Sequence, residues 1–184
     1  MEKLVIIGAG IAGLTAAIYA ARANLQPLVI LGKEEGGQLM LTTVVENYPC
    51  FPEGIMGPEM ISKAREQAKR FGTRFKDGNV EVFSVKNSSN NVYEIVVDGE
   101  KIEAKSVIIA TGASARMLGL ESEKKYFARG VHTCATCDGY FYSGKDIAVV
   151  GGGDSACEES LFLAKLVNSV TIIHRKGQLR ASRI

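Results

Sequence analysis

The sequence predicts an α/β protein with two strand–turn–helix–strand units and an antiparallel meander between them. Glycine-rich turns follow short apolar segments at residue 8 and again at residue 151. Between these turns, over residues 80–109, apolar and polar residues alternate, which is typical of half-buried antiparallel strands. The two units share the same order of elements, so the chain contains an internal repeat.

The first unit lies in the N-terminal 31 residues. Residues 4–7 form an apolar run bounded by glycine, as expected for a buried parallel strand. Residues 12–23 favour a helix, and residues 27–31 form a second buried strand. Strand, glycine turn, helix and strand within about 30 residues make a βαβ unit.

A second helix and the meander follow the first unit. Residues 59–71 are predicted to be helical because their apolar residues recur close to one face. The meander is expected to turn at residues 87–91 and 98–99, and a further apolar strand covers residues 106–110. The apolar residues of the helix are Met60, Ile61, Ala64, Ala68 and Phe71, and the meander strands are residues 80–83, 92–97 and 101–104.

The second unit is predicted as a strand at residues 147–150, a helix at 155–166 and a strand at 170–173. The sequence ends soon afterwards, whereas a doubly wound domain needs more strands. We therefore expect two successive Rossmann-like domains, residues 1–114 with the meander and residues 115–184, of which the second is incomplete. The boundary is expected near residues 113–118.

Composition and charge bound the class of protein. The chain has 184 residues, of which 46% are hydrophobic and 23% charged, and its net charge is +2. This balance is typical of a globular α/β protein and gives no bulk field favouring nucleic acid or a membrane. No stretch approaches the ~20 apolar residues of a membrane span. Four cysteines in a chain of this size favour a reducing compartment, so we expect the cytoplasm.

The first glycine turn, residues 8–13, fits the dinucleotide-binding pattern G-x-G-x-x-G between a strand and a helix. Gly8 permits the tight turn, Gly10 lets the backbone approach a pyrophosphate, and Gly13 lets helix and strand pack closely. The helix N-terminus offers unpaired N–H groups to the phosphates. Where an acidic residue usually binds ribose, the sequence has Leu31 and Gly32. Glu34, Glu35 or the backbone of residues 36–38 could serve instead, and the sequence leaves these open.

The second turn, residues 151–156, has Ala156 in place of the third glycine. Its second strand is followed by a basic cluster, His174, Arg175 and Lys176, with Arg180 close behind. A guanidinium pairs with a phosphate in a bidentate, charge-assisted way, so this cluster suits the 2′-phosphate of NADP. The alternative is a solvated basic turn.

Cys134 and Cys137 are the centre of the chemistry that the sequence predicts. Two thiols at this spacing close a small disulfide ring that opens and reforms by thiolate exchange. The alternatives are half of a zinc site, which needs two more ligands, and a passive structural pair. Asp138 could transfer protons for the thiolates, or could cap a helix or occupy a turn. Cys50, Cys157 and His132 are expected to be structural. We expect no metal.

With these motifs in order, the chain resembles the bacterial-type, low-molecular-weight thioredoxin reductases of the pyridine nucleotide-disulfide oxidoreductases. The Cys-Ala-Thr-Cys-Asp-Gly segment just before the second glycine turn separates this group from glutathione reductase-like relatives. The matching stretches cover residues 8–13, 36–39, 45–49, 109–113, 134–139, 151–159 and 174–180.

The resemblance implies an FAD domain, an NADPH domain and a homodimer in which electrons pass from NADPH through FAD and the Cys134–Cys137 disulfide to thioredoxin. It implies that Cys137 faces the flavin, that Cys134 attacks the substrate disulfide, and that Asp138 is the acid/base. The implied cofactor-binding positions are Gly8, Gly10, Ile11, Ala12, Gly13, Leu31, Gly32, Gly37, Gln38, Leu39, Asn47, Val80, Ala110, Thr111 and Gly112, and then Gly151, Gly153, Asp154, Ser155, His174, Arg175, Lys176 and Arg180.

Two departures from the family leave alternatives open. Lys176 stands where a second arginine is common, which keeps the charge but loses the bidentate fork. The family's C-terminal half is missing, so the chain could be a fragment or a non-catalytic nucleotide-binding relative. The reductase of a peroxiredoxin system shares these motifs, but its extra N-terminal region is not expected here because the first strand begins just after Met1. A zinc-binding interaction module is the remaining alternative.

Overall fold

The computed structural model describes residues 1–87 and 92–182, and confirms the predicted α/β class. The chain divides into two compact units, Met1–Ser114 and Ala115–Ile184, which are described separately below. Among the described residues, no helix is both long enough and apolar enough to cross a membrane.

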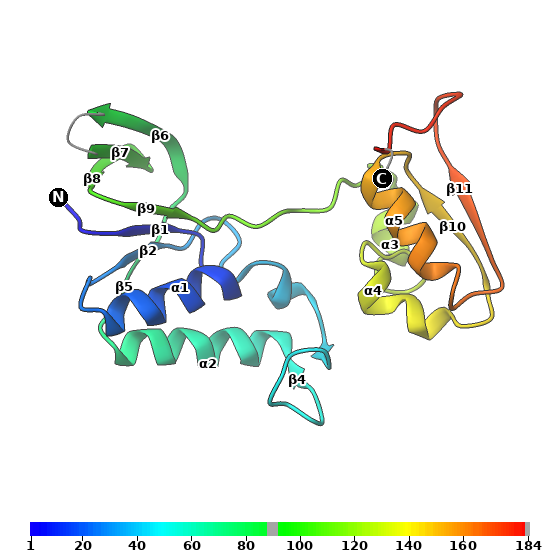
Figure 1. Ribbon diagram of the computed structural model, residues 1–184, viewed down its shortest axis with the longest axis horizontal. Coiled ribbons are helices and arrows are strands. Elements are labelled where there is room, and N and C mark those ends of the chain that lie inside the picture. The colour runs from blue at the N-terminus through cyan, green and yellow to red at the C-terminus, as the bar shows by residue number, and fades with distance from the viewer. Residues whose placement is uncertain (88–91, 183–184) are drawn as a thin grey trace. The chain divides into compact units, whose positions relative to one another are not determined.

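The first unit is built on a parallel sheet of four short strands in the order β5-β2-β1-β9 (Figure 1). The central strand β1 pairs in register with its neighbours, so that Ile7 lies opposite both Ile30 and Ile109. The loops that follow these three residues therefore leave the same edge of the sheet. The strands are β1 (Val5–Ile7), β2 (Leu28–Ile30), β5 (Arg74–Lys76) and β9 (Val107–Ile109).

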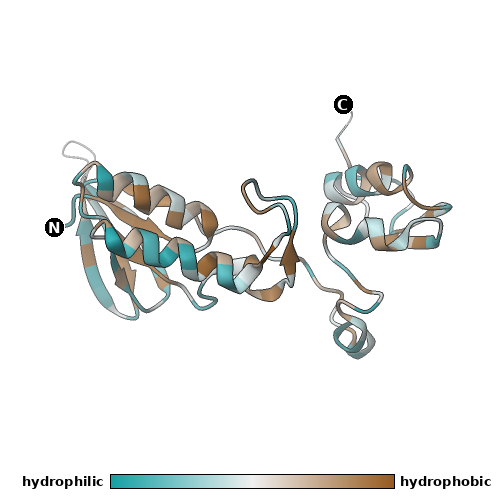
Figure 2. Cartoon of the chain, turned by 90° about the horizontal axis from the view of Figure 1, so that it is seen from below, coloured by the Kyte–Doolittle hydropathy of each residue, from teal (hydrophilic) through white to brown (hydrophobic). Residues whose placement is uncertain are grey.

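Two helices cover one face of this sheet (Figure 1). They are α1 (Ile11–Arg22) and α2 (Gly57–Arg70), and α2 is hydrophilic on its outward surface (Figure 2). Their small buried residues Ala17 and Ala68 pack in a core with Ile6 and Val29 of the sheet. The helix predicted over residues 59–71 begins two residues earlier and ends one earlier, so Phe71 is its C-cap.

The predicted meander covers the opposite face of the sheet and is confirmed. Its inward residues Ile95, Val97 and Ile102 pack on the other faces of β1 and β2, which completes a three-layered unit. Asp98 and Gly99 both have positive φ, as a tight hairpin turn requires. The other predicted turn, at residues 87–91, lies largely outside the described residues. The strands are β6 (Val80–Asn87), β7 (Val92–Val97) and β8 (Glu100–Ala104).

The second unit contains a two-stranded parallel sheet, β10 (Asp146–Val150) and β11 (Ser169–Ile173), joined by α5 (Asp154–Leu163). The helix predicted over residues 155–166 ends three residues early. The chain turns there so that the Leu166 carbonyl accepts the Gly144 N–H at 3.1 Å. Before the sheet lie α3 (Glu121–Tyr126), α4 (Ala135–Asp138) and the 3-10 helix η2 (Gly139–Tyr142).

Candidate functional site

The first glycine turn is closed so tightly that side chains would not fit. Gly8 has φ of +111°, and its N–H donates to the Ile30 carbonyl at 2.9 Å. A Cβ added to Gly8 would lie 2.3 Å from the Ala110 oxygen, and one added to Gly13 would lie 2.0 Å from the Gly8 oxygen. The turn therefore packs against the end of β9 as well as against α1.

A second glycine pair lies against the first turn. Gly36 and Gly37 both have positive φ and lead into the 3-10 helix η1 (Gly37–Leu41). A Cβ on Gly37 would be 3.7 Å from the Gly10 Cα, so the two backbones face each other without side chains. Gly10 also caps α1, and among the described residues no side chain makes a capping hydrogen bond at this helix end. These backbones form a cradle, lined by N–H groups, that fits a pyrophosphate.

The structure brings together some of the sequence-predicted positions of this unit and separates others. Residues 8–13, Gly37 and residues 110–111 meet at one edge of the sheet. Asn47 is exposed in the loop between β3 (Val44–Val45) and β4 (Ile55–Met56), and its side chain makes no hydrogen bond within the described residues. Val80, the first residue of β6, is half-buried and packs against the core between the meander and the sheet.

The residues that could bind the ribose of a nucleotide differ in the contacts that they already make. The Glu35 carboxylate forms an ion pair with Arg65, whose guanidinium lies 5.0 Å from the centre of the Phe75 ring. The Leu31 side chain is buried in the core, so only its backbone faces outward. The Glu34 backbone accepts the Gly37 N–H at 3.1 Å. Of the two carboxylates, Glu34 is the one without a salt bridge among the described residues.

The second glycine turn repeats the first in its hydrogen bonds. Gly151, with φ of +152°, donates its N–H to the Ile173 carbonyl at 3.0 Å, and Gly153 caps α5. The basic cluster lies beside this turn. A Cβ added to Gly152 would lie 3.3 Å from the Cβ of His174. The backbone N–H of Arg180 donates to the Gly152 carbonyl at 2.6 Å.

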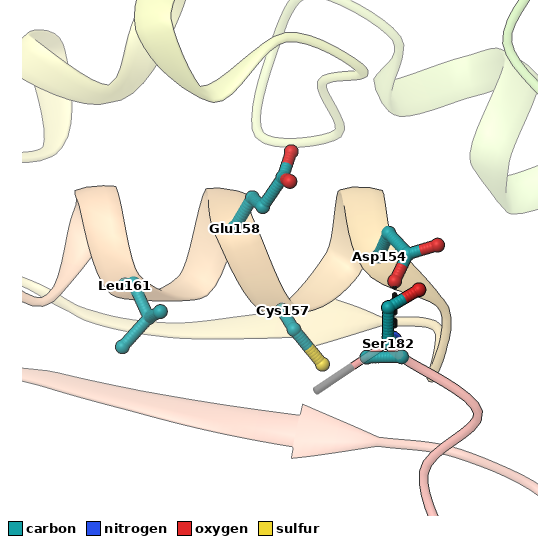
Figure 3. A pocket seen from close by; sticks show the side chains of 6 residues that line it. Asp154, Cys157, Glu158, Leu161 and Ser182 are labelled. Atoms are coloured by element: carbon teal, nitrogen blue, oxygen red, sulfur yellow. Dashed lines mark hydrogen bonds between the residues drawn. The ribbon is translucent and has the colours of Figure 1, made fainter. Parts of the chain in front are cut away.

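A shallow cavity lies beside α5 and the segment after β11 (Figure 3). There the Ser182 N–H donates to the Asp154 carboxylate, and this hydrogen bond lowers the pKa of Asp154. Asp154 is thus engaged in holding residues 180–182 near the glycine turn. Cys157 is half-buried along the same helix and lines the cavity.

Cys134 and Cys137 form the predicted disulfide, with Cα atoms 5.3 Å apart. Cys134 caps the short helix α4, and its sulfur accepts the Cys137 N–H at 3.2 Å. Gly139 follows, and a Cβ there would lie 2.6 Å from Leu163, so this segment packs closely on α5. The described residues contain no group of three or more side chains able to hold a metal ion.

The Asp138 carboxylate is bound by His132, which the sequence predicts to be structural. His132 Nδ1 lies 2.9 Å from Asp138 Oδ2, and His132 Nε2 lies 2.8 Å from the Tyr142 hydroxyl. No periodicity links residues 132, 138 and 142. The only sequence signal was that a histidine and an aspartate flank the Cys-x-x-Cys motif.

Large apolar side chains are exposed next to the disulfide. Tyr140 and Phe141, directly after the Cys-Ala-Thr-Cys-Asp-Gly segment, are 76% and 75% exposed. Two adjacent aromatic rings on a surface are typical of contact sites for another protein.

Two nucleotide-type turns with a disulfide between them in sequence define an oxidoreductase class, and the comparisons agree. The pyridine nucleotide-disulphide oxidoreductase family matches residues 2–183, and the chain belongs to it.

Within this family the chain is similar to thioredoxin reductases, as the motifs predict. It is 52% identical to thioredoxin reductase of Mycolicibacterium smegmatis, covering 100% of this chain and 58% of that protein. The crystal structure of thioredoxin reductase from Streptococcus pyogenes matches with a TM-score of 0.85 and 43% identity, over 99% of this chain and 58% of that one. A Pseudomonas fluorescens protein named glucosaminate ammonia-lyase is 47% identical, covering 100% of this chain and 56% of its own length. The chain thus spans little more than half of these relatives.

Proposed function

We propose that the protein is an NADPH-dependent flavoprotein disulfide reductase that reduces thioredoxin. The observation that carries this proposal is the Cys134–Cys137 disulfide, which sits at the surface and is followed at once by a carboxylate. A purely structural bridge would gain nothing from a neighbouring proton carrier, whereas thiolate exchange needs one.

The first unit would hold FAD. Its support is the side-chain-free cradle between Gly10 and Gly37 at the start of α1, where added Cβ atoms would fill the space. Bound FAD would supply two-electron transfer between NADPH and the disulfide. The backbones of residues 8–13, 31–32, 37–39 and 110–112 would bind it, with Asn47 and Val80 as the outlying positions.

The second unit would hold NADPH. The first turn of α5, which follows Gly153 and includes Ser155, would supply backbone N–H groups to a pyrophosphate. The segment after β11 carries four basic residues, and in this fold the residues at that place bind a 2′-phosphate. They are His174, Arg175, Lys176 and Arg180. Asp154 would act indirectly, by anchoring the segment that carries Arg180.

The two cysteines would carry the exchange with substrate. In the reduced protein the Cys134 thiolate attacks one sulfur of the substrate disulfide, and the other substrate sulfur leaves as a thiolate. Cys137 then attacks Cys134, which releases the second substrate thiolate and restores the Cys134–Cys137 disulfide. The two thiol protons pass to the substrate thiolates with Asp138 as acid/base, so the enzyme dithiol is oxidised as the substrate disulfide is reduced.

The substrate would be a protein. The exposed Tyr140 and Phe141 offer an apolar surface beside the disulfide, which a small disulfide would not need. The names of the similar proteins favour thioredoxin. A homodimer in the cytoplasm is the assembly and compartment that this function implies.

A visible absorption spectrum of the purified chain tests the proposal. We expect flavin bands that bleach on anaerobic addition of NADPH and return when oxidised thioredoxin is added. The matched variant Cys134→Ser/Cys137→Ser should still bleach but should not reduce thioredoxin. A protein that stays colourless when FAD is supplied contradicts the proposal and supports a non-catalytic relative.

A further inference from the structure

A chain of three side chains brackets the disulfide. His132 precedes Cys134 by two residues, and Asp138 follows Cys137 directly. The imidazole joins Asp138 at 2.9 Å through Nδ1 and Tyr142 at 2.8 Å through Nε2. The His132–Asp138 contact therefore closes a second, non-covalent ring around the disulfide. Tyr142 of η2 binds the other nitrogen of the same imidazole.

The hydrogen bonds select the tautomer of His132. The Gly130 backbone N–H points at Nε2 at 3.4 Å, and a backbone N–H can only donate. Nε2 is therefore the acceptor, and its one lone pair is shared between this N–H and the nearer Tyr142 hydroxyl. The ring proton then lies on Nδ1 and is donated to Asp138, so the histidine presents a donor to an ionised carboxylate.

His132 is also the residue that sets the position of the Asp138 side chain. Within the described part of the chain, the Asp138 carboxylate makes no other hydrogen bond or ion pair. The side chains of His132 and Asp138 are 21% and 34% exposed, so the pair is partly shielded from water. A partly buried, charge-assisted hydrogen bond fixes a rotamer better than a surface pair does.

We propose that His132 is a positioning residue for the redox centre, which holds Asp138 in place to move protons during dithiol–disulfide exchange. This inference rests on the proposed function. When Cys137 attacks Cys134 in the mixed disulfide, its thiol proton passes to the Asp138 carboxylate and then to the departing substrate thiolate. His132 keeps its own proton on Nδ1 throughout and aligns the carboxylate. Tyr142 acts one step further away, by aligning His132.

Paired amide variants separate alignment of Asp138 from packing. An asparagine places an amide near the position of Nδ1, so His132→Asn retains a donor to Asp138 and loses the bond to Tyr142. A glutamine reaches the position of Nε2, so His132→Gln retains Tyr142 and loses Asp138. Tyr142→Phe removes only the hydroxyl. Tyr126→Phe is its control, because the Tyr126 hydroxyl has no hydrogen-bond partner among the described residues.

The experiment measures kcat and KM of the full chain with thioredoxin, together with a half-reaction that needs neither FAD nor NADPH. In the half-reaction the protein is reduced with dithiothreitol, and stopped flow follows its reoxidation by an aromatic disulfide reagent. The signal of the Cys134→Ser/Cys137→Ser variant, which reports Cys50 and Cys157, is subtracted.

We expect His132→Gln to lower kcat and the half-reaction rate about tenfold, the value of one charge-assisted hydrogen bond, with KM unchanged. His132→Asn and Tyr142→Phe should fall only about twofold to threefold, and Tyr126→Phe not at all. Equal losses in the asparagine and glutamine variants, or no loss in either, would overturn the inference. If the wild type shows no NADPH-driven turnover but the half-reaction keeps this order, the proposed function fails and the role of His132 stands.

Discussion

The two glycine turns of this chain have the same local geometry in very different surroundings. In each, the first glycine donates its N–H to the last residue of the second strand, Ile30 in one unit and Ile173 in the other. In each, the third residue of the turn caps a helix without a capping side chain. Ile30 is fully buried, whereas Ile173 is 52% exposed. The geometry of the turn is therefore specified by its own residues. How far the second strand is buried depends on the layers that pack around the sheet.

The position of the third glycine in the pattern shows where the surrounding layers affect the turn. In the first unit Ala110 of the β9 end presses on the turn, and a Cβ on Gly13 would meet the Gly8 backbone. In the second unit Ala156 occupies this position, and the nearest contact for an added Cβ on Gly151 is Ala156 itself at 2.8 Å. An added Cβ on Gly8 or Gly13 would meet backbone atoms, whereas one on Gly151 would meet the Ala156 side chain, and Gly8 and Gly151 both have a positive φ that favours glycine.

The largest expected contrast comes from truncating the two matched isoleucines. Ile30→Ala should destabilise the first unit by about 4 kcal/mol, because it empties a site in a closed core. Ile173→Ala should cost about 1 kcal/mol or less, because half of that side chain is already in water. Urea unfolding of both variants measures the difference. Equal losses would show that β11 is covered in solution.

Exchanging the residues at the third glycine position of the pattern, Gly13 and Ala156, should have the next largest effect. Gly13→Ala forces a methyl group against backbone and should cost about 3 kcal/mol, with loss of FAD binding. The reverse change, Ala156→Gly, should cost about 1 kcal/mol or less, the intrinsic price of a glycine in a helix. Denaturant unfolding and flavin content report both effects. If the two variants behave alike, packing does not distinguish the turns.

The same contrast explains what the sequence could predict. Both turns, the first two strands and the disulfide depend on residues that are neighbours in sequence, and they were found from spacing alone. The strand β5, Arg74-Phe75-Lys76, was missed because three residues with two charges carry no strand pattern, and pairing with β2 decides their conformation. After α5 ends at Leu163, the Leu166 carbonyl accepts the Gly144 N–H, a contact between residues far apart in sequence that no local pattern indicates.

Within the candidate site, the limits of sequence reasoning have the same cause. The approach of Gly37 to Gly10 was predictable only as a family resemblance, since it depends on how two loops leave one sheet edge. Val80 and Asn47 were placed by resemblance as well, and neither contacts the glycine cradle through a hydrogen bond of the described residues. The His132–Asp138 contact required the fold of α4.

The residues that follow β2 and β11, the second strands of the two units, differ in charge, and we expect a smaller effect on function from this difference. The first unit continues into Leu31 and Gly32, whereas the second continues into His174 and Arg175. Arg175→Gln should raise KM for NADPH about tenfold and leave that for NADH unchanged, because only NADPH carries the 2′-phosphate. Lys165→Gln, just beyond the C-terminal end of α5, removes the same charge as a control. An unchanged KM for NADPH would assign Arg175 to a solvated turn, and equal increases for both nucleotides would show that it does not contact the 2′-phosphate.

The smallest expected effect compares how the two units hold a carboxylate. Glu123 of α3 accepts the N–H groups of Leu118 and Gly119, each at 2.9 Å, and the hydrogen bond from Leu118 lowers its pKa. Glu103 of the meander pairs with Lys86, whose hydrogen bond lowers the pKa of Glu103. A carboxyl group with a lowered pKa stabilises the folded state at neutral pH. This contribution is lost as the pH falls below about 4.5, because protonation is then favoured in the unfolded chain first.

The donors differ, so salt should distinguish the two carboxylates. Backbone N–H groups carry no net charge and bind Glu123 at any ionic strength, whereas salt screens the exposed Lys86–Glu103 pair. Glu123→Gln should therefore lower the melting temperature at pH 7 in low and high salt alike, and the difference from wild type should shrink at pH 4. Glu103→Gln should have a smaller effect that disappears in high salt. If salt abolishes both effects, the Glu123 carboxylate is held by long-range charge and not by the N–H groups of Leu118 and Gly119.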